Sequence, residues 1–262
     1  MIMRRNMNAL APALALLAAA SALSAQSVAS RVSRVRDGTV RMSFTARPGV
    51  CGNGSSFVST RRGEYIGSRG GEWENDCESG PVRVSMSVEG GEVRALRTYV
   101  GGRWREVNAA STDLGMIAAS DAAAFLVNLA RTSAGRAARD AIFPATLADS
   151  ATIWPGLLQL AKDTSRPRDA RRQAIFWLGQ AAGDQATGML DSVATDSNGD
   201  SDVREQAVFA LSQRPKDQSV PALITVARTN HDPEIRRKAM FWLGQSNDPR
   251  AIALFEEILA KH

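Results

Sequence analysis

The first regular pattern along the chain is a strict alternation of apolar and polar residues over 39–46. Its apolar positions are Val40, Met42, Phe44 and Ala46. A period of two residues predicts a half-buried β-strand. The same alternation returns over 82–89, and a further strand is predicted over 92–100. Gly90-Gly91 lies between these two runs and predicts a tight hairpin, because such a turn requires positive φ.

A second glycine pair, Gly101-Gly102, predicts another turn before a strand over 103–107. The earlier segment 47–80 is rich in glycine and serine and is predicted to be mostly loop. We therefore expect residues 39–108 to form a small antiparallel β meander with one apolar face. So few strands bury little area, and the stability of this part should depend on cross-linking or further packing.

One ten-residue phrase occurs three times in the second half of the chain. Its copies run over 171–180, 204–213 and 236–245. The copies share an alanine, at Ala174, Ala207 and Ala239, and a weaker copy lies upstream around Ala141. The spacing of these alanines is nearly constant, and a period in the low thirties predicts an array of stacked supersecondary units.

A second type of helix alternates with this phrase. Its apolar runs begin at Leu126, Leu157, Leu190, Leu223 and Phe255. The helix over about 121–132 therefore has no partner and should cover the open end of the stack, since an end repeat otherwise exposes its core face. We predict an α+β protein in which residues 121–262 form an α-solenoid of one capping helix plus four helix pairs. A polar outer surface is expected on the last helix, from Glu256, Glu257, Lys261 and His262.

The N-terminus has the pattern of a secretory signal peptide. Residues 1–25 carry Arg4 and Arg5, then an apolar run, then small residues. The run is short for a transmembrane helix, which needs about 20 apolar residues. We expect an exported protein, periplasmic or extracellular, without a membrane span. Residues 26–38 are predicted to be a flexible leader, and residues 109–120 a linker.

Cys51 and Cys77 are the two cysteines of the chain. In an exported protein an even pair is expected to form a disulfide. The bond would close the loop that contains most of the glycine- and serine-rich segment. The chain-entropy estimate for a loop of this length is about 3–4 kcal/mol of stabilisation.

Charge argues against one class of partner. The formal net charge is +5, but residues 114–262 carry 17 basic and 17 acidic groups. Proteins that bind nucleic acid gain affinity from concentrated positive charge. A neutral solenoid, exported from the cell, is therefore not expected to bind nucleic acid.

Two stretches of the repeat carry a family resemblance. They are Asp232-Pro233-Glu234-Ile235-Arg236-Arg237-Lys238-Ala239 followed by Leu243-Gly244, and Asp202-Val203-Arg204 followed by Ala207 and Leu211. They resemble the short bacterial HEAT repeat, over about residues 121–262. The resemblance implies a solenoid of helix pairs that binds other proteins. Residues 39–108 lie outside it.

The resemblance also implies a buried ladder of arginines and aspartates, the aspartates opening the second helices. The matching positions are Arg171, Arg204, Arg236, Asp184, Asp217 and Asp248. The first unit departs from the pattern, because it has Ala138 at the arginine position and Pro144 within the helix. We expect the ladder to end there.

A phenylalanine falls on the outward side of each first helix, nearly opposite the arc that should face the paired helix. These residues are Phe143, Phe176, Phe209 and Phe241. Two interpretations stay open. The stripe is either an interaction surface or a lateral contact between neighbouring repeats.

The sequence offers no set of residues that predicts catalysis or metal binding. His231 and His262 are the two histidines, and no cluster has zinc spacing. Segment 196–202 resembles the start of a calcium loop but has Ser201 in place of the glycine and Ala207 in place of the closing glutamate. We interpret it as a capped turn between repeats, and we expect no cofactor and no enzymatic activity.

These features lead to the hypothesis of a monomeric, exported, non-enzymatic scaffold that binds a protein partner. If the second helices line the binding side, the candidate contacts are Gln159, Lys162, Asp191, Thr195, Thr225 and Arg228. Two alternatives remain open. One is an accessory subunit or lyase similar to the phycobilisome-lyase-type HEAT proteins, which would need a tetrapyrrole or another prosthetic group. The other is a structural component of the cell envelope.

Overall fold

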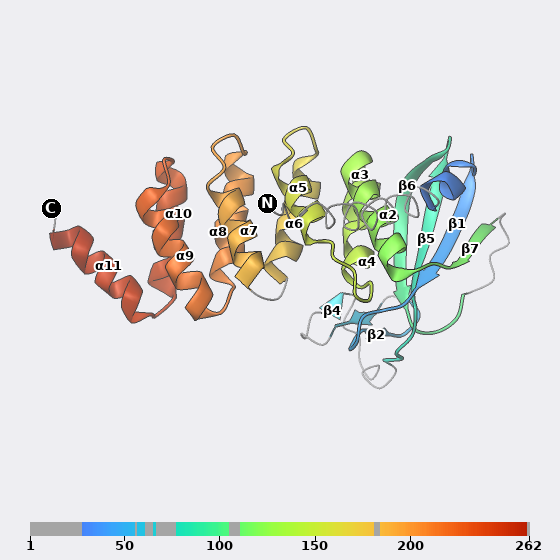
Figure 1. Cartoon of the computed structure of the whole chain (residues 1–262), viewed down its shortest axis with the longest axis horizontal. Helices are drawn as coiled ribbons and strands as arrows, with labels where there is room; N and C mark the ends of the chain where they lie inside the picture. Colours follow the sequence, from blue (N-terminus) through green and yellow to red (C-terminus); the bar gives the residue numbers. More distant parts are fainter. Residues whose placement is uncertain are drawn as a thin grey trace, which may run out of the picture. The chain divides into compact units, whose positions relative to one another are not determined.

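A computed structural model describes residues 28–55, 57–60, 65–66, 77–104, 111–180 and 184–260. The chain groups into two compact units (Figure 1). The sheet unit lies within Met1–Leu129 and Phe143–Thr152, and the helical unit within Ala130–Ile142 and Ile153–His262. The predicted α+β class is confirmed, with an antiparallel-rich β region and a disulfide before a helical repeat region. The predicted signal peptide lies outside the described residues.

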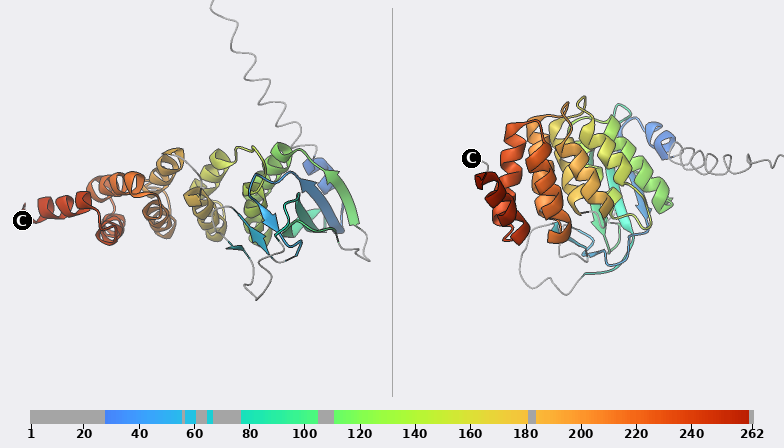
Figure 2. Two further views of the ribbon diagram at one scale, coloured as in Figure 1. Left: turned by 90° about the horizontal axis from the view of Figure 1, so that it is seen from below. Right: turned by 60° about the vertical axis from the view of Figure 1, so that its left-hand side comes forward.

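The helical unit consists of two layers of helices. Its helices are α3 (Gly135–Asp140), α5 (Trp154–Lys162), α6 (Arg168–Gln180), α7 (Asp184–Ala194), α8 (Ser201–Ser212), α9 (Lys216–Thr229), α10 (Pro233–Gln245) and α11 (Pro249–Ala260). The first helices α6, α8 and α10 pack side by side in one layer, and the second helices α5, α7, α9 and α11 in the other (Figure 2). The alternation of helix types read from the repeat is therefore confirmed.

The buried face of the first helices follows the predicted arc. In α6, Ala170, Ala174, Trp177 and Leu178 are each at most 2% exposed. Burial at positions three and four residues apart is what directs one stripe of a helix toward the core. Helix α10 begins with an aspartate cap, since Asp232 Oδ1 accepts a hydrogen bond of 2.9 Å from the backbone N–H of Glu234.

The first repeat unit, where we expected only the ladder to end, also has an interrupted helix. Helix α3 ends at Asp140, and α4 (Ile142–Thr146) begins after Ala141. A regular continuation is disfavoured here, because Pro144 has no N–H to donate to the carbonyl of Asp140 and its ring crowds that carbonyl. Helix α2 (Ala119–Thr132) corresponds to the predicted capping helix. Its residues up to Leu129 group with the sheet unit.

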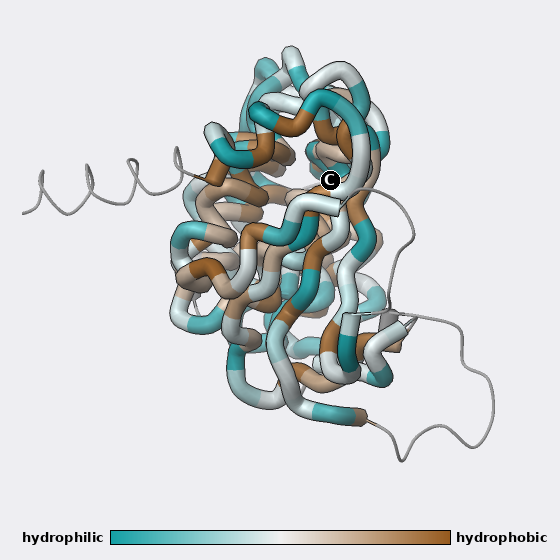
Figure 3. Tube along the Cα trace, turned by 90° about the vertical axis from the view of Figure 1, so that its right-hand side faces the viewer, coloured by the Kyte–Doolittle hydropathy of each residue, from teal (hydrophilic) through white to brown (hydrophobic). Residues whose placement is uncertain are grey.

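Hydrophobic and hydrophilic segments are interspersed along the chain (Figure 3). Within the described ranges, no helix combines the length and the apolar character that crossing a bilayer requires.

The sheet unit is built on a four-stranded sheet with the strand order β6-β5-β1-β7. The strands are β1 (Gly38–Phe44), β5 (Val82–Glu89), β6 (Glu92–Val100) and β7 (Ser111–Met116). β1, β5 and β6 pair antiparallel, whereas β7 lies parallel to β1. The predicted apolar face is confirmed, since Val40, Met42 and Phe44 are each 0% exposed.

One of the two predicted glycine turns is a hairpin. Gly90 and Gly91 have φ of 61° and 82° and connect β5 to β6. Gly101 and Gly102 also have positive φ, at 70° and 62°. The strand predicted after them is absent at residues 103–104, and residues 105–107 lie outside the described part.

Side chains hold the second glycine pair in a different structure. The backbone N–H of Gly102 donates to Glu78 Oε2 at 2.9 Å, and the Arg83 guanidinium donates to the carbonyl of Gly101. These bonds direct the backbone toward β5 and the disulfide loop instead of into an adjacent strand.

Two predicted irregular segments are ordered. Within the predicted linker 109–120, β7 pairs with β1 in the register Thr39↔Ser111. Within the predicted leader, residues 28–33 form a helical segment in which Val28 and Val32 are 2% and 4% exposed. Side chains four residues apart share one helix face, so this single apolar pair anchors the segment. Two valines four residues apart are too few to show a helical period in the sequence.

A later part of the chain returns to the end of β1. Ala46 and Ala148 form an antiparallel bridge. The N–H of Arg47 donates to the carbonyl of Leu147 at 2.8 Å, and the N–H of Asp149 donates to that of Thr45 at 3.0 Å. This pairing explains why Phe143–Thr152 groups with the sheet unit.

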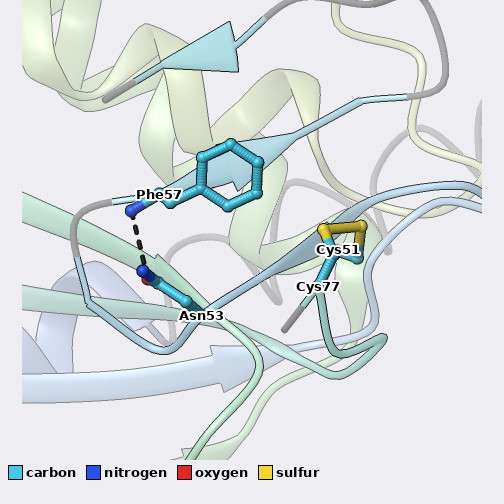
Figure 4. The surroundings of a disulfide bond; sticks show 4 residues. All are labelled: Cys51, Asn53, Phe57 and Cys77. Atoms are coloured by element: carbon cyan, nitrogen blue, oxygen red, sulfur yellow. Dashed lines mark hydrogen bonds between the residues drawn. A yellow bond between two sulfur atoms is a disulfide. The ribbon is translucent and has the colours of Figure 1, made fainter. Parts of the chain in front are cut away.

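The glycine-rich segment before β5 contains a second, smaller sheet. Its strands are β2 (Cys51–Gly52), β3 (Val58–Ser59) and β4 (Tyr65–Ile66), in that order. The predicted disulfide between Cys51 and Cys77 is confirmed (Figure 4). Near it, Asn53 Oδ1 accepts a hydrogen bond of 3.1 Å from the N–H of Phe57. The disulfide thus joins β2 to the residues that lead into β5.

Candidate protein-interaction surface

A ladder of arginine–aspartate pairs links successive first helices. The Arg171 guanidinium of α6 donates to Asp200 Oδ2, just before α8. Arg204 of α8 pairs with Asp232 Oδ2, just before α10, at 3.0 Å. Arg171 and Arg204 are 2% and 7% exposed, so these two arginines, which were predicted to be buried, are buried.

Arg204 makes two further contacts. It donates to the side-chain oxygen of Asn230 at 2.9 Å and to the carbonyl of Ala194 at 3.3 Å. Asn230 also donates to the carbonyl of Ala194 at 3.1 Å. A buried cation is tolerated when its donors are satisfied in this way. The network fixes the loops between repeats and so determines how neighbouring repeats present their surfaces.

The aspartates of the ladder differ from those predicted. Arg171 and Arg204 pair with the aspartates that open first helices, and not with those that open second helices. Asp217 is exposed at the start of α9, and the side chain of Asp184 lies outside the described part of the chain. Asp248 is buried but pairs with Arg250 of its own helix at 2.8 Å. That hydrogen bonding lowers the pKa of Asp248 to about 2.

The difference has a geometric cause. A first helix packs next to the following first helix in the same layer. The arginine therefore reaches the N-terminus of that neighbour, where a carboxylate is also favoured by the helix dipole. The sequence carries a signal for this arrangement, because Asp200 and Asp232 each precede a helix and lie at nearly equal separations, 29 and 28, from their arginines.

The segment that resembles a calcium loop is a turn between repeats, as interpreted from the sequence, but Asp200 makes no side-chain cap bond to α8. The N–H of Asn198 donates to Asp196 Oδ1 at 3.1 Å, and the N–H of Gly199 to the carbonyl of Asp196 at 3.1 Å. Asp200 accepts from Arg171, which lowers the pKa of this aspartate.

Four of the six candidate contact residues on the second helices are bonded within the chain. Lys162 Nζ lies 3.9 Å from Asp196 Oδ2, and the Arg228 guanidinium forms an ion pair with the Glu257 carboxylate. The hydroxyls of Thr195 and Thr225 donate to carbonyls of their own helices, at 2.8 and 3.1 Å. Gln159 is not fully buried. We call the six candidate contact residues, Asp191 included, the polar row.

Asp191 is the exception in the polar row. Its side chain is half-buried, and its Oδ1 atom has no hydrogen-bond partner among the residues that the structure describes. Burial raises the pKa of Asp191 above its usual value, because removal from water disfavours the charged form.

A second surface follows the first helices. Phe176, Phe209 and Phe241 are 39%, 37% and 55% exposed at equivalent positions of α6, α8 and α10. We call them the phenylalanine row. The ring centroid of Phe209 also lies 5.2 Å from that of Trp242 on the next helix. The lateral contact between repeats is thus present at Phe209, which also remains partly exposed. The interpretation as an interaction surface stays a prediction. Phe143 groups with the sheet unit instead.

Polar residues flank the phenylalanine row in a repeated pattern. Four residues before the phenylalanines are Arg172, Glu205 and Arg237, and four residues after them are Gln180, Gln213 and Gln245. Residues four apart lie on one face of a helix. Glu205 is paired with Lys238 at 3.0 Å, so its charge is offset within the row. The result is an apolar row with basic groups on one side and glutamines on the other.

The sheet unit has its own cluster of charged and aromatic groups. The guanidinium carbons of Arg41 and Arg83 lie 4.8 and 5.1 Å from the ring centroid of Trp104, within the range of a cation–π interaction. Arg83 is 3% exposed, and its burial lowers its pKa. This cluster supports the turn at Gly101, whose carbonyl Arg83 binds.

The helical repeats match a known family. Residues 192–262, from the end of α7 through α11, match the family model for HEAT repeats. No curated protein matches the chain. The match shows that residues 192–262 carry HEAT repeats, and the two layers of alternating helices fit it.

Proposed function

We propose that this protein is an exported, non-enzymatic scaffold that binds a protein partner along the phenylalanine row of its HEAT-repeat solenoid. The observation that carries the proposal is the exposure of Phe176, Phe209 and Phe241 at one position of three adjacent helices. Exposed apolar side chains that line up across several elements are typical of interaction sites. HEAT repeats also indicate a protein-interaction solenoid.

The residues beside the phenylalanine row indicate which kind of partner surface would fit it. Arg172 and Arg237 lie beside the phenylalanines and are exposed, and Arg237 also pairs with Glu234 of its own helix at 2.6 Å. The glutamines on the other side offer both donors and acceptors. A matching partner surface has an apolar strip with acidic residues along one edge. The polar row is the less favourable site, because four of its six members, Lys162, Thr195, Thr225 and Arg228, already have partners within the chain.

Three features support the parts of the proposal that concern export and catalysis. The signal-like pattern of residues 1–25 and the disulfide both suit an oxidising compartment outside the cytoplasm. The same residue types recur in each repeat, which suits an extended contact surface better than a single reactive centre. We place the protein in the periplasm or outside the cell.

Site-specific photo-crosslinking in living cells tests the binding surface. A photoreactive amino acid replaces Phe209 in one variant and Thr225, on the polar row, in the matched control. We expect one abundant protein adduct from position 209 and none from position 225, as shown by mass spectrometry. Adducts from position 225 alone, or from neither position, would contradict the proposed surface.

Cell fractionation with N-terminal sequencing tests export separately. We expect the protein in the periplasmic or extracellular fraction, with its first residue near position 26. A cytoplasmic protein that retains Met1 would contradict export and leave the crosslinking result untouched.

A further inference from the structure

We propose that the phenylalanine row binds a proline-rich segment of its partner, which adopts the polyproline II conformation and lies across α6, α8 and α10. This inference rests on the proposed function, because it names the kind of partner that the same surface takes. The features that support it are the exposure of the rings inside the stack, their spacing, the glutamines beside them and the charge at one edge.

The phenylalanines are exposed although neighbouring first helices are in place. Helix α6 has α8 beside it, and α8 has α10 (Figure 2). Phe176 and Phe209 nevertheless remain 39% and 37% exposed. Their exposure therefore belongs to the outward side of the layer and does not depend on where the stack stops. Apolar surface that stays in water inside a packed array is typical of an interaction site.

Tryptophans hold the exposed rings in place. The ring centroid of Phe176 lies 5.1 Å from that of the buried Trp177, and the centroids of Phe209 and Phe241 lie 5.2 and 5.0 Å from that of Trp242. Packing against a large ring restricts the phenylalanine side chains before a partner arrives, which lowers the entropic cost of binding. Surfaces lined by aromatic rings are also the ones that bind proline-rich segments.

The spacing of the rings limits the conformation of the partner. The phenylalanines occupy equivalent positions of helices that pack side by side, and the axes of packed helices lie about 8–10 Å apart. A β-strand returns to the same face every ~6.7 Å, which does not match this repeat. A polyproline II segment returns to the same face after about 9.3 Å, and an α-helix after about 10.5 Å. Both of these can place one apolar side chain at each ring.

The glutamines favour polyproline II over an α-helix. Gln180, Gln213 and Gln245 follow the phenylalanines by about 6 Å along each helix, and helical side chains lean back toward the N-terminus. The Gln213 amide donates one hydrogen bond to Ser212 Oγ at 3.1 Å, which leaves its second N–H for a partner. An α-helix pairs its backbone groups internally, whereas a polyproline II backbone has no internal hydrogen bonds. Its carbonyls can therefore accept from an amide at each repeat.

The charge beside the row places an acidic residue at one end of the segment. Arg172 of α6 is exposed and forms no ion pair with a carboxylate among the residues that the structure describes. At the same position of α8, Glu205 is paired with Lys238 at 3.0 Å. At that position of α10, Arg237 is paired with Glu234 at 2.6 Å. The segment therefore carries an aspartate or glutamate at the end that lies over α6.

The test uses the full chain and three fluorescent peptides of about 12 residues. The first has proline at every third position and an aspartate at one end. The second has asparagine in place of that aspartate. The third is stapled as an α-helix, with leucine at every seventh position and the same terminal aspartate. We expect anisotropy to give the first peptide a Kd below about 1 mM, at least about tenfold tighter than the helical peptide.

Variants of the protein test the contacts one at a time, after circular dichroism has shown that each is folded. Gln213→Leu combined with Gln245→Leu keeps the surface apolar but removes two amides, so the first peptide should bind about tenfold more weakly. Gln159→Leu, on the polar row, is the matched control and should bind like the wild type. Arg172→Gln should weaken the first peptide about threefold and leave the asparagine peptide unchanged.

Any of four results would overturn the proposal. They are a proline-rich peptide that does not bind, a helical peptide that binds as tightly, a double glutamine variant that binds like the wild type, and an Arg172→Gln effect of equal size on both proline-rich peptides. If no peptide binds but position 209 crosslinks to a protein, the proline-rich partner is wrong and the phenylalanine row stands. If position 209 also gives no adduct, the proposed function fails as well.

Discussion

The sheet unit and the helical unit are stabilised by contacts of different range. In the sheet unit, β7 pairs with β1 although β5 and β6 lie between them in the sequence. The Cys51–Cys77 disulfide connects β2 of the smaller sheet to the residues that lead into β5. Residues 147–149 form backbone hydrogen bonds with the end of β1. In the helical unit each helix contacts its neighbours in the stack, and Arg204 reaches no farther than the loop of the next repeat.

This difference concerns how far a perturbation travels. A stack of repeats has a stability that is approximately a sum of repeat terms and nearest-neighbour terms. The loss of one arginine–aspartate pair should therefore destabilise only the repeats that this pair connects. In the sheet unit the pairings of β1 with β5 and β7 join distant parts of the chain, so the loss of one should loosen the unit as a whole. The predictions below test this contrast, beginning with the largest expected effect.

Arg204→Met should cost the helical unit about 3–5 kcal/mol, because it leaves Asp232 without the cation that the fold places beside it. Hydrogen exchange measured by mass spectrometry should show faster exchange in α8, α9 and α10, with the sheet unit unchanged. Faster exchange throughout both units would contradict the local character of the ladder.

A matched control is Lys238→Met. Lys238 belongs to an exposed pair with Glu205, and exposed pairs contribute about 0–1 kcal/mol. Exchange in this variant should stay close to that of the wild type.

Replacement of Cys51 and Cys77 by serine should cost the sheet unit about 3–4 kcal/mol, by the chain-entropy estimate for a loop of this length. Exchange should accelerate across β1, β5 and β6 together, and α8 and α10 should stay protected. Reduction of the wild-type protein should give the same pattern. An effect confined to the segment between the two cysteines would show that the sheet unit is also governed locally.

Asp191→Asn should give the smallest effect, and one of opposite sign. Burial raises the pKa of Asp191, so the folded state disfavours the charged carboxylate. Above the folded pKa the wild type carries this penalty, whereas below about pH 4, where the carboxyl of the unfolded chain is protonated as well, the penalty is absent. The variant should be more stable at pH 7, by less than about 1 kcal/mol because water screens a half-buried group.

Urea unfolding at pH 7 and pH 3, followed by circular dichroism, measures this difference. We expect a higher midpoint for the variant at pH 7 and equal midpoints at pH 3. A lower midpoint at pH 7 would show that the carboxylate makes a contact that an amide does not replace.

The helical unit was more predictable from the sequence than the sheet unit, for a physical reason. Each repeat shows the same residues in the same surroundings, so Ala174, Ala207 and Ala239 supply three observations of one buried position. The sheet has no such redundancy. The parallel pairing of β7 depends on Leu114 as its one buried side chain, which gives no alternation to detect. The return of residues 147–149 rests on backbone hydrogen bonds, which side-chain patterns do not record.

The candidate surface was predictable only in part. The pattern placed the phenylalanine row outward, and the exposure of Phe176, Phe209 and Phe241 agrees with that placement. The partners of the buried arginines were not predictable from helix periodicity, because that periodicity describes a single helix. Which helix lies beside which depends on how the layers stack, and only the three-dimensional arrangement shows that Arg171 meets Asp200.

The return of residues 147–149 to β1 also bears on how such a protein can evolve. Along the sequence the chain passes between the two units three times, after Leu129, after Ile142 and after Thr152. Gene fusion at any single one of these points would separate a unit from part of itself. The solenoid can lengthen by duplication of one whole repeat, but the sheet unit is inherited only together with the first helices that follow it.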